Sequence, residues 1–235
     1  MVRGNATPYP APMRPTTLRP LPVPPPFRIL FADGPGADLV IAFSSVGHDP
    51  ERVPSPEFVA TATNGGRRAL FVADESRSWA NHPGFAPALQ QALAHVGTVR
   101  RIATTGLSMG GFCALAAAEV LPVDVALAFS PQWSLRNETR WTRWTDALPP
   151  IRYPTAPIAA RWTVLFHGAL DDLPQALPFP QCPGLDHLIF PDLAHSSLVP
   201  HLKSRGVLAG LMDSALAGDR RRLLRIAASA GGRRR

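Results

Sequence analysis

The sequence is poor in cysteine and in lysine. Its two cysteines, Cys113 and Cys182, belong to no C-x-x-C pair and cannot supply a disulfide framework or four zinc ligands. We expect both to be free thiols. Lys203 is the only lysine among 24 basic residues. This bias towards arginine suggests a coding preference, so no single arginine is taken as evidence of a functional site.

Long apolar runs are also missing. No run is long enough for a membrane span, and the first residues lack the apolar stretch and small-residue cleavage site of a secretory signal. We therefore expect a cytoplasmic protein. The composition, with 46% apolar and 17% charged residues in a chain of 235, is typical of a folded domain and excludes wholesale disorder.

Positive charge is concentrated at one end of the chain. The net charge is +7, but residues 219–235 hold seven arginines and one aspartate, which leaves 17 basic and 16 acidic residues in 1–218. A basic groove on the body is therefore not expected. The Arg-rich C-terminal tail, 219–235, could contact nucleic acid or an anionic membrane. Clustered terminal arginines are more often solvated and disordered, and we expect that here.

Proline marks off the other end. The first 26 residues contain nine prolines, which predicts a Pro-rich N-terminal arm over 1–26 that is either extended or disordered. Short apolar segments then alternate with helix-compatible ones over 27–218, with an insertion at 131–160. The pattern predicts strands at 27–32, 39–44, 68–73, 99–105, 123–129, 161–166 and 185–190, and helices at 87–96, 109–121 and 196–216. The fold class expected is α/β, a mostly parallel central sheet with helices on both faces.

A serine lies at one strand-to-helix junction. The strand ending near Thr105 runs into Gly106-Leu107-Ser108-Met109-Gly110-Gly111, a G-x-S-x-G pattern followed directly by a helix. On such a sharp turn the serine hydroxyl projects above the sheet, and a Cβ at position 106 or 110 would meet neighbouring backbone. The helix amino end beside the serine favours developing negative charge. A plain tight turn is the alternative interpretation.

A nucleophilic serine needs a base and a group that orients the base. His195 follows the strand at 185–190 through a short loop, and Asp171 and Asp172 follow the strand that ends at Phe166. The carboxyl ends of parallel strands meet at one edge, so these residues are expected to lie near Ser108. His167 is expected to be a structural residue at a strand end. A metal site built from His167, Asp171 and His195 lacks a known ligand spacing, and no metal is predicted.

These motifs resemble the α/β-hydrolase superfamily, in which the serine, the acid and the histidine occur in this chain order. The resemblance covers about residues 37–217 and is most specific at 106–111, at His167-Gly168-x-x-Asp171 and at Ala194-His195-Ser196. It implies Ser108 as nucleophile, Asp171 as acid and His195 as base, with Asp172 as the alternative acid. It also implies an oxyanion hole made of the Met109 amide and an amide from Ser45 or Val46. The usual His-Gly at that loop is replaced by Ser44-Ser45-Val46-Gly47, so this chain departs from the family pattern at the oxyanion loop.

The insertion contains three of the five tryptophans. Trp141 and Trp144 are three residues apart, and Trp133 and the nearby arginines 136, 140 and 143 lie in the same segment. These tryptophans either line a substrate pocket or pack a small helix onto the sheet, and Trp79 is expected to form another wall of the pocket. Because the insertion is short, a large lid is not expected.

Two hypotheses follow for the function. The first is a serine hydrolase that cleaves carboxylic esters, or thioesters, of small to medium acyl groups through an acyl-enzyme, without a cofactor or metal. The second is a hydrolase-like binding or accessory protein with little turnover. The partner expected under the first hypothesis is a small-molecule ester.

Overall fold

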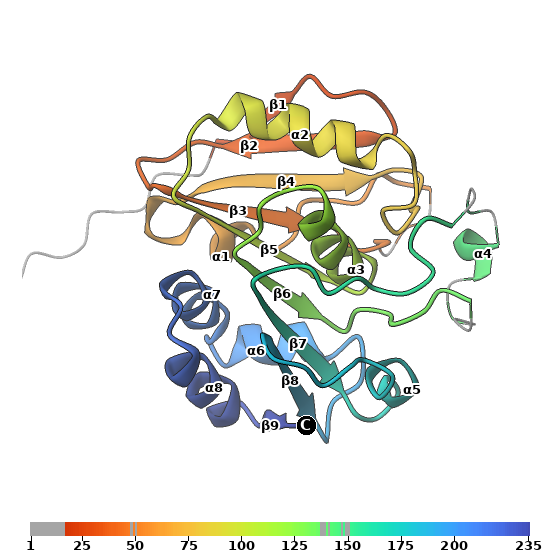
Figure 1. Cartoon of the computed structure of the whole chain (residues 1–235), viewed down its shortest axis with the longest axis vertical. Helices are drawn as coiled ribbons and strands as arrows, with labels where there is room; N and C mark the ends of the chain where they lie inside the picture. Colours follow the sequence, from red (N-terminus) through yellow and green to blue (C-terminus); the bar gives the residue numbers. More distant parts are fainter. Residues whose placement is uncertain are drawn as a thin grey trace, which may run out of the picture.

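The structure is a computed structural model that describes residues 17–47, 49, 51–136, 140, 142–146, 148 and 151–235. Within this part of the chain, nine strands form one sheet in the order β1-β2-β4-β3-β5-β6-β7-β8-β9 (Figure 1). The strands are β1 (Arg19–Leu21), β2 (Phe27–Ala32), β3 (Asp38–Phe43), β4 (Arg68–Asp74), β5 (Arg101–Leu107), β6 (Val125–Phe129), β7 (Trp162–Gly168), β8 (Leu185–Phe190) and β9 (Arg233–Arg234). The strands from β4 to β8 in this order pair in parallel, and the edge pairs are antiparallel, which confirms the mostly parallel sheet.

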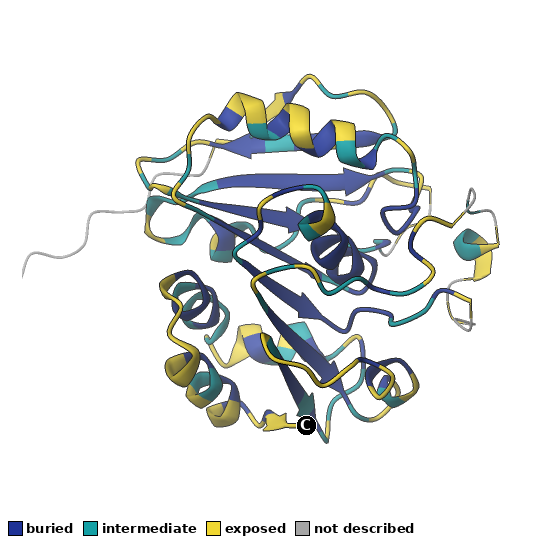
Figure 2. Cartoon of the chain, in the orientation of Figure 1, coloured by how far each residue is buried: buried dark blue, intermediate teal, exposed yellow. Residues whose placement is uncertain are grey.

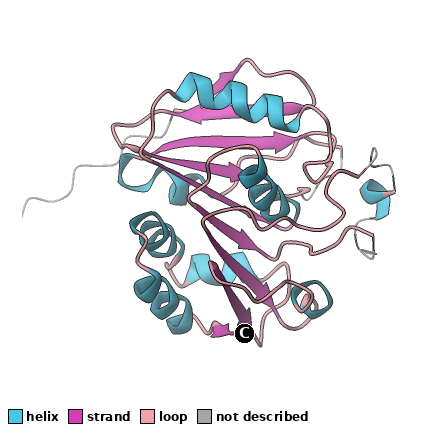
Figure 3. Cartoon of the chain, in the orientation of Figure 1, coloured by secondary structure: helices cyan, strands magenta, loops and turns pink. Residues whose placement is uncertain are grey.

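Helices cover both faces of the sheet (Figure 3). The helices are α1 (Val59–Thr63), α2 (Phe85–Val96), α3 (Met109–Ala116), α4 (Thr142–Thr145), α5 (Leu173–Ala176), α6 (Leu198–Ser204), α7 (Leu208–Ala217) and α8 (Arg220–Ser229), with 3-10 turns η1 (Asn64–Gly66) and η2 (Ala117–Glu119). Buried side chains of α2 and α3 join one apolar cluster, and those of α1, α6, α7 and α8 join another.

The central strands are apolar on both faces because each face is covered. In β3, Leu39, Ile41 and Phe43 belong to the cluster of α2 and α3, whereas Val40 and Ala42 belong to the cluster on the other side. Alternate residues of a strand point to opposite faces, so a strand buried on both sides is apolar at most of its positions. The buried strands and the more exposed outer surfaces of the helices are visible in Figure 2.

The segments expected to flank the domain contribute strands to the sheet where the structure describes them. The predicted N-terminal arm contributes β1, whose Pro20 pairs with Leu30 of β2. The predicted disordered tail is folded as α8 and β9. Asp219 caps α8 by accepting a hydrogen bond from the Arg222 amide at 2.9 Å. The prediction was wrong because the arginines are interleaved with apolar residues that pack on the body, as Leu223 does.

The last predicted helix is also divided. The segment expected to be one helix at 196–216 forms α6 and α7, and Gly206 lies between them with a φ of 67°. Among the helices that the structure describes, none combines the length and the apolar character needed to cross a bilayer.

One edge of the sheet brings the candidate residues together. Parallel strands β5, β7 and β8 end at Leu107, Gly168 and Phe190. The loops after these three ends carry the candidate serine, the two aspartates and the candidate histidine. In Figure 1, α4 and α5 lie beyond the arrowheads on this side of the molecule. The topology therefore brings the candidate residues to one carboxyl edge, as the sequence predicts.

Candidate active site

Ser108 lies on the turn between β5 and α3 in a strained conformation. Its φ of 56° and ψ of −121° are rarely adopted by residues other than glycine. Its amide donates to the Phe129 carbonyl at 2.8 Å, and its own carbonyl accepts from the Phe112 amide at 3.0 Å. The side chain is buried. The turn is thus tied both to β6 and to the first turn of α3.

The two glycines of the motif are required by close backbone contacts. A Cβ on Gly106 would lie 2.3 Å from the Gly110 carbonyl oxygen, and a Cβ on Gly110 would lie 2.3 Å from the Phe43 carbonyl oxygen. Neither neighbour is a flexible side chain that could move aside. The crowding expected from the sequence is therefore confirmed, and it explains how the chain passes so close to β3.

His195 is held by a buried carboxylate. Its Nδ1 lies 2.9 and 3.0 Å from the two carboxyl oxygens of Asp172, whose side chain is 2% exposed. With Nδ1 donating to this carboxylate, proton exchange with a reacting group runs through Nε2. The pair has the geometry in which a carboxylate fixes the tautomer and orientation of an imidazole.

Asp171 does not occupy the position that the sequence predicts for it. Its carboxylate accepts a hydrogen bond from the backbone amide of His195 at 2.6 Å, and the residue is exposed. The partner of the imidazole is Asp172, the alternative acid. The chain turns between these two residues, so that one side chain supports the backbone of the histidine loop and the other contacts the ring.

Asp172 also forms an ion pair with an arginine of the insertion at 131–160. Arg140 Nη1 lies 2.9 Å from Asp172 Oδ1. Burial alone raises the pKa of Asp172, but the hydrogen bond and charge of His195 outweigh it, so the pKa lies below its ordinary value. The depressed pKa keeps this carboxylate ionised at neutral pH, which suits it to stabilise an imidazolium.

The expected oxyanion donors are only partly available. Met109 is the first residue of α3, so its amide has no acceptor within the helix. The Ser45 amide and hydroxyl both donate to Glu57 Oε1, at 3.1 and 2.5 Å. Ser45 is therefore not the expected donor, because a carboxylate already uses its amide. Within the described residues no acceptor contacts the Val46 amide, which stays a candidate alongside Met109.

The tryptophans have different surroundings. Trp133 packs edge-on against Phe179, with ring centroids 5.0 Å apart, as expected for the packing alternative. Trp144 lies under the Arg77 guanidinium, 5.6 Å from the ring centroid. Trp141 lies outside the described residues. Trp79 is fully buried near the serine, so it is part of the support of the site rather than an exposed pocket wall.

Sequence reasoning missed Gln132. This fully buried glutamine lies in the loop after β6, and its Nε2 is 3.0 Å from Ser108 Oγ. Its Oε1 accepts from Trp79 Nε1 at 2.9 Å. No motif marks the residue, and the proximity depends on how the insertion leaves the sheet, so no signal in the sequence points to it.

His167 forms part of a buried chain of hydrogen bonds beside the site. Its Nε2 is 3.0 Å from the Pro131 carbonyl oxygen, and its Nδ1 is 2.8 Å from His187 Nε2. Burial lowers the pKa of His167 to about 4 and that of His187 to about 3. Both rings are therefore neutral near pH 7, and His167 has a structural place at the end of β7. Among the described residues, no three histidine, cysteine or acidic side chains converge as metal ligands would.

Comparison with solved structures decides the fold. The capsule O-acetyltransferase of Neisseria meningitidis serogroup A superimposes with a TM-score of 0.60 at 11% identity, over 81% of this chain and 94% of that one. An esterase of Pyrococcus furiosus gives 0.57 at 16% identity, over 88% and 94%. A bacterial heroin esterase gives 0.55 at 22% identity, over 88% and 84%. The chain has the α/β-hydrolase fold. The sequence matches no protein-family model and no curated protein.

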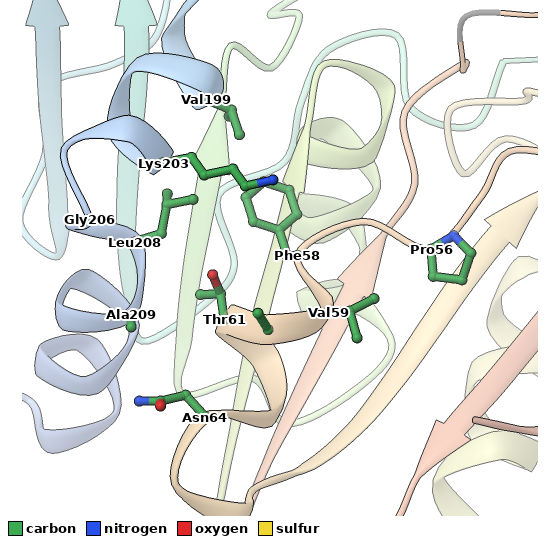
Figure 4. Close-up of a pocket in the computed structure, with 11 residues that line it drawn as sticks. Pro56, Phe58, Val59, Thr61, Asn64, Val199, Lys203, Gly206, Leu208 and Ala209 are labelled. Atoms are coloured by element: carbon green, nitrogen blue, oxygen red, sulfur yellow. The ribbon is translucent and has the colours of Figure 1, made fainter. Parts of the chain in front are cut away.

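This α/β-hydrolase fold also has a pocket away from the serine turn. A hollow of about 590 Å³ lies between α1 and the α6–α7 pair (Figure 4). Phe58 and Val59 line one wall, and Val199, Lys203 and Leu208 line the other. None of the side chains that surround Ser108 contributes to its lining. The pocket is therefore not the one in which a substrate would meet the serine.

Proposed function

We propose that this protein is a serine hydrolase that cleaves carboxylic esters, or thioesters, of small to medium acyl groups. The observation that carries the proposal is the His195–Asp172 pair at the same sheet edge as Ser108, which itself sits in the strained turn. The esterases among the solved structures with this fold are in keeping with it. The proposed catalytic residues are Ser108, His195 and Asp172.

The proposed reaction proceeds through an acyl-enzyme. His195 Nε2 takes the proton of the Ser108 hydroxyl while Oγ attacks the acyl carbon. The negative charge on the former carbonyl oxygen is stabilised by the amides of Met109 and Val46. The tetrahedral intermediate collapses, the acyl–oxygen or acyl–sulfur bond breaks, and the leaving alcohol or thiol takes the proton from His195. Water, activated by His195, then releases the acid and regenerates the serine.

The test combines a covalent probe with a series of esters. A fluorophosphonate should add one mass increment at Ser108 of the wild type and none in Ser108→Ala. Turnover of p-nitrophenyl esters should fall by at least about 10⁴-fold in that variant. The acyl-chain series from acetyl to octanoyl then reports the depth of the pocket. Probe labelling of Ser108→Ala, or undiminished turnover, would refute the assignment.

The binding or accessory function keeps one specific observation in its favour. Because Glu57 engages the Ser45 amide, the loop after β3 offers fewer donors to an oxyanion than the resemblance implies. A protein of this kind would show neither probe labelling nor turnover over a wide panel of esters. Labelling without turnover would indicate instead that the deacylation step, or the right acceptor, is missing.

The acyl acceptor is the open part of the first proposal. One protein with this fold is described as a capsule O-acetyltransferase. An acyl-enzyme on Ser108 can pass its acyl group to a hydroxyl as well as to water, since both attack the same ester carbon. Partition of the acyl group between water and added alcohols, measured with an acetyl ester and an acetyl thioester as donors, distinguishes the two outcomes.

A further inference from the structure

Ser108 has a buried side-chain neighbour besides the proposed triad. Gln132 and Trp79 are both fully buried, and they come from loops on different sides of the serine strand, after β6 and after β4. The Trp79 indole N–H donates to Gln132 Oε1 at 2.9 Å, and Gln132 Nε2 lies 3.0 Å from Ser108 Oγ. A hydrogen-bonded chain therefore runs from a tryptophan to the candidate nucleophile.

The tryptophan settles which way the amide points. An indole N–H can only donate, so its partner on Gln132 has to be the carbonyl oxygen. The amide nitrogen is then the group that faces Ser108, and it donates to Oγ. Because Oγ accepts this hydrogen bond, the hydroxyl proton of Ser108 points elsewhere and is available to a base.

We propose that Gln132 is a catalytic hydrogen-bond donor to the Ser108 oxygen, an inference that rests on the proposed serine chemistry. Partial negative charge develops on Oγ in the transition state of attack, as its proton leaves for His195, and again in deacylation, when the bond from Oγ to the acyl carbon breaks. A fixed amide dipole in a buried place stabilises such charge without reorganising. Gln132 Nε2 contacts Oγ, so its action is separate from that of the Met109 and Val46 amides, which are proposed to bind the former carbonyl oxygen.

Both members of the pair are held in place by their neighbours. The Trp79 carbonyl accepts from Asn81 Nδ2 at 2.9 Å. The residue before Gln132 is Pro131, whose carbonyl oxygen lies 3.0 Å from His167 Nε2. The Trp79 indole orients the Gln132 amide, and the contact between Pro131 and His167 fixes the backbone before it. A side chain that only filled space would need neither contact. The arrangement is that of a preorganised donor.

The decisive variant is Gln132→Met, which keeps the length of the side chain and removes the donor. We expect kcat for the best p-nitrophenyl ester to fall by about 10²- to 10³-fold, with KM little changed, because the lost interaction acts in the transition state. The rate of fluorophosphonate labelling should fall similarly. Gln132→Glu, which places an acceptor against the oxygen, should be at least as slow.

Trp79→Phe tests the orientation of the amide. Losing the indole N–H leaves Gln132 present but less fixed, so we expect a fall in kcat of about tenfold. In the double variant with Gln132→Met, kcat should be no lower than in Gln132→Met alone, because the tryptophan acts through the glutamine. Multiplied losses in the double variant would contradict this coupling.

Gln91→Met is the control. Gln91 is a glutamine of α2, away from the serine turn, and its Nε2 donates to the Pro22 carbonyl at 2.6 Å. We expect it to lower Tm and to leave kcat within about twofold. If Gln132→Met behaves like this control, with normal kcat and labelling, Gln132 is structural and the inference fails. If the wild type itself is not labelled, the proposed function fails instead.

Discussion

The serine side and the histidine side of the carboxyl edge are held by different forces. On the serine side, Gly106 and Gly110 allow backbone contacts that leave no room for a Cβ, and Ser108 takes its strained conformation from them. On the histidine side, carboxylates hold the loop. Asp171 binds the His195 backbone, and Asp172 binds its ring.

The serine side therefore depends on the fit of backbone atoms, and the histidine side depends on charge. Steric contacts depend on which backbone atoms approach each other. They are therefore insensitive to pH, but they are lost when a larger side chain is introduced. Contacts to carboxylates and imidazoles depend on protonation, so they tolerate small changes of volume and respond to pH. We therefore expect the two sides to fail in different ways, and the following variants test whether they do.

The largest effect is expected on the serine side. In Gly110→Ala the new Cβ would meet the Phe43 carbonyl oxygen at 2.3 Å, so the turn and β3 have to separate. We expect the free energy of unfolding to fall by about 4 kcal/mol or more, or the protein not to fold. Urea unfolding measures this. Gly210→Ala is the control, because there the added Cβ meets only the end of the Ile226 side chain, and stability should change by at most about 1 kcal/mol.

The next effect is on chemistry, on the histidine side. Asp172→Asn keeps the volume but removes the charge that orients the ring, so kcat should fall on the order of 10³-fold with the fold intact. Asp171→Asn keeps an oxygen that accepts from the His195 amide, so kcat should change by about threefold or less. The two variants are compared at matched folding by circular dichroism. The reverse ranking would make Asp171 the acid.

The two adjacent aspartates illustrate what the sequence can and cannot predict. The G-x-S-x-G turn was predictable because its glycines are required by close contacts within the turn itself. The apolar segments predicted most strands to within two or three residues of their ends. Asp171 and Asp172 are adjacent, have the same chemistry, and differ only in the direction of their side chains. That direction depends on the path of the loop after β7, which no local pattern encodes.

Contacts between distant segments were equally out of reach. Glu57 accepts a hydrogen bond from the Ser45 amide from twelve residues further along the chain, and Gln132 contacts Ser108 from 24 residues further along. The fold of the C-terminal segment, in contrast, could have been predicted, because the sequence carries a signal for a packed helix. Leu223 and Ala227 are four residues apart on α8 and both are buried, an amphipathic spacing that the count of arginines obscured.

The third effect is a dependence of stability on pH. Burial lowers the pKa of His167 to about 4 and of His187 to about 3, whereas in the unfolded chain both titrate near 6.5. Between these values the unfolded state binds more protons, so stability falls as the pH is lowered. We expect a loss on the order of 2 to 4 kcal/mol between pH 7 and pH 5.

Urea unfolding at several pH values measures this loss, and His187→Asn supplies the comparison. The variant should be less stable at pH 7, because the bond to His167 Nδ1 is weakened, but its stability should depend less on pH. The same pH dependence in wild type and variant would show that groups other than these histidines cause it. The proposed pH sensitivity of the histidine side would then be wrong.

The smallest effect concerns the C-terminal arginines, which divide into two groups. Arg235 donates to the carbonyls of Ala176 and Phe179 at 3.0 Å each, and its amide donates to the His187 carbonyl. Arg220 pairs with the buried Asp186 at 2.6 Å. Arg221, Arg222 and Arg225 are exposed on α8 instead. Arg235 therefore supports the histidine side, Arg220 binds the start of β8, and the arginines of the second group face solvent.

Removal of residues 233–235 should therefore lower the free energy of unfolding by about 1 to 2 kcal/mol, because β9 and the Arg235 hydrogen bonds are lost. Replacement of Arg221, Arg222 and Arg225 by glutamine should leave stability within about 0.5 kcal/mol, since surface positions contribute little. If this exposed face binds polyanions, retention on heparin falls in the glutamine variant and survives the truncation. Equal stability of the truncated chain and the wild type would show that the C-terminal strand does not support the histidine side at all.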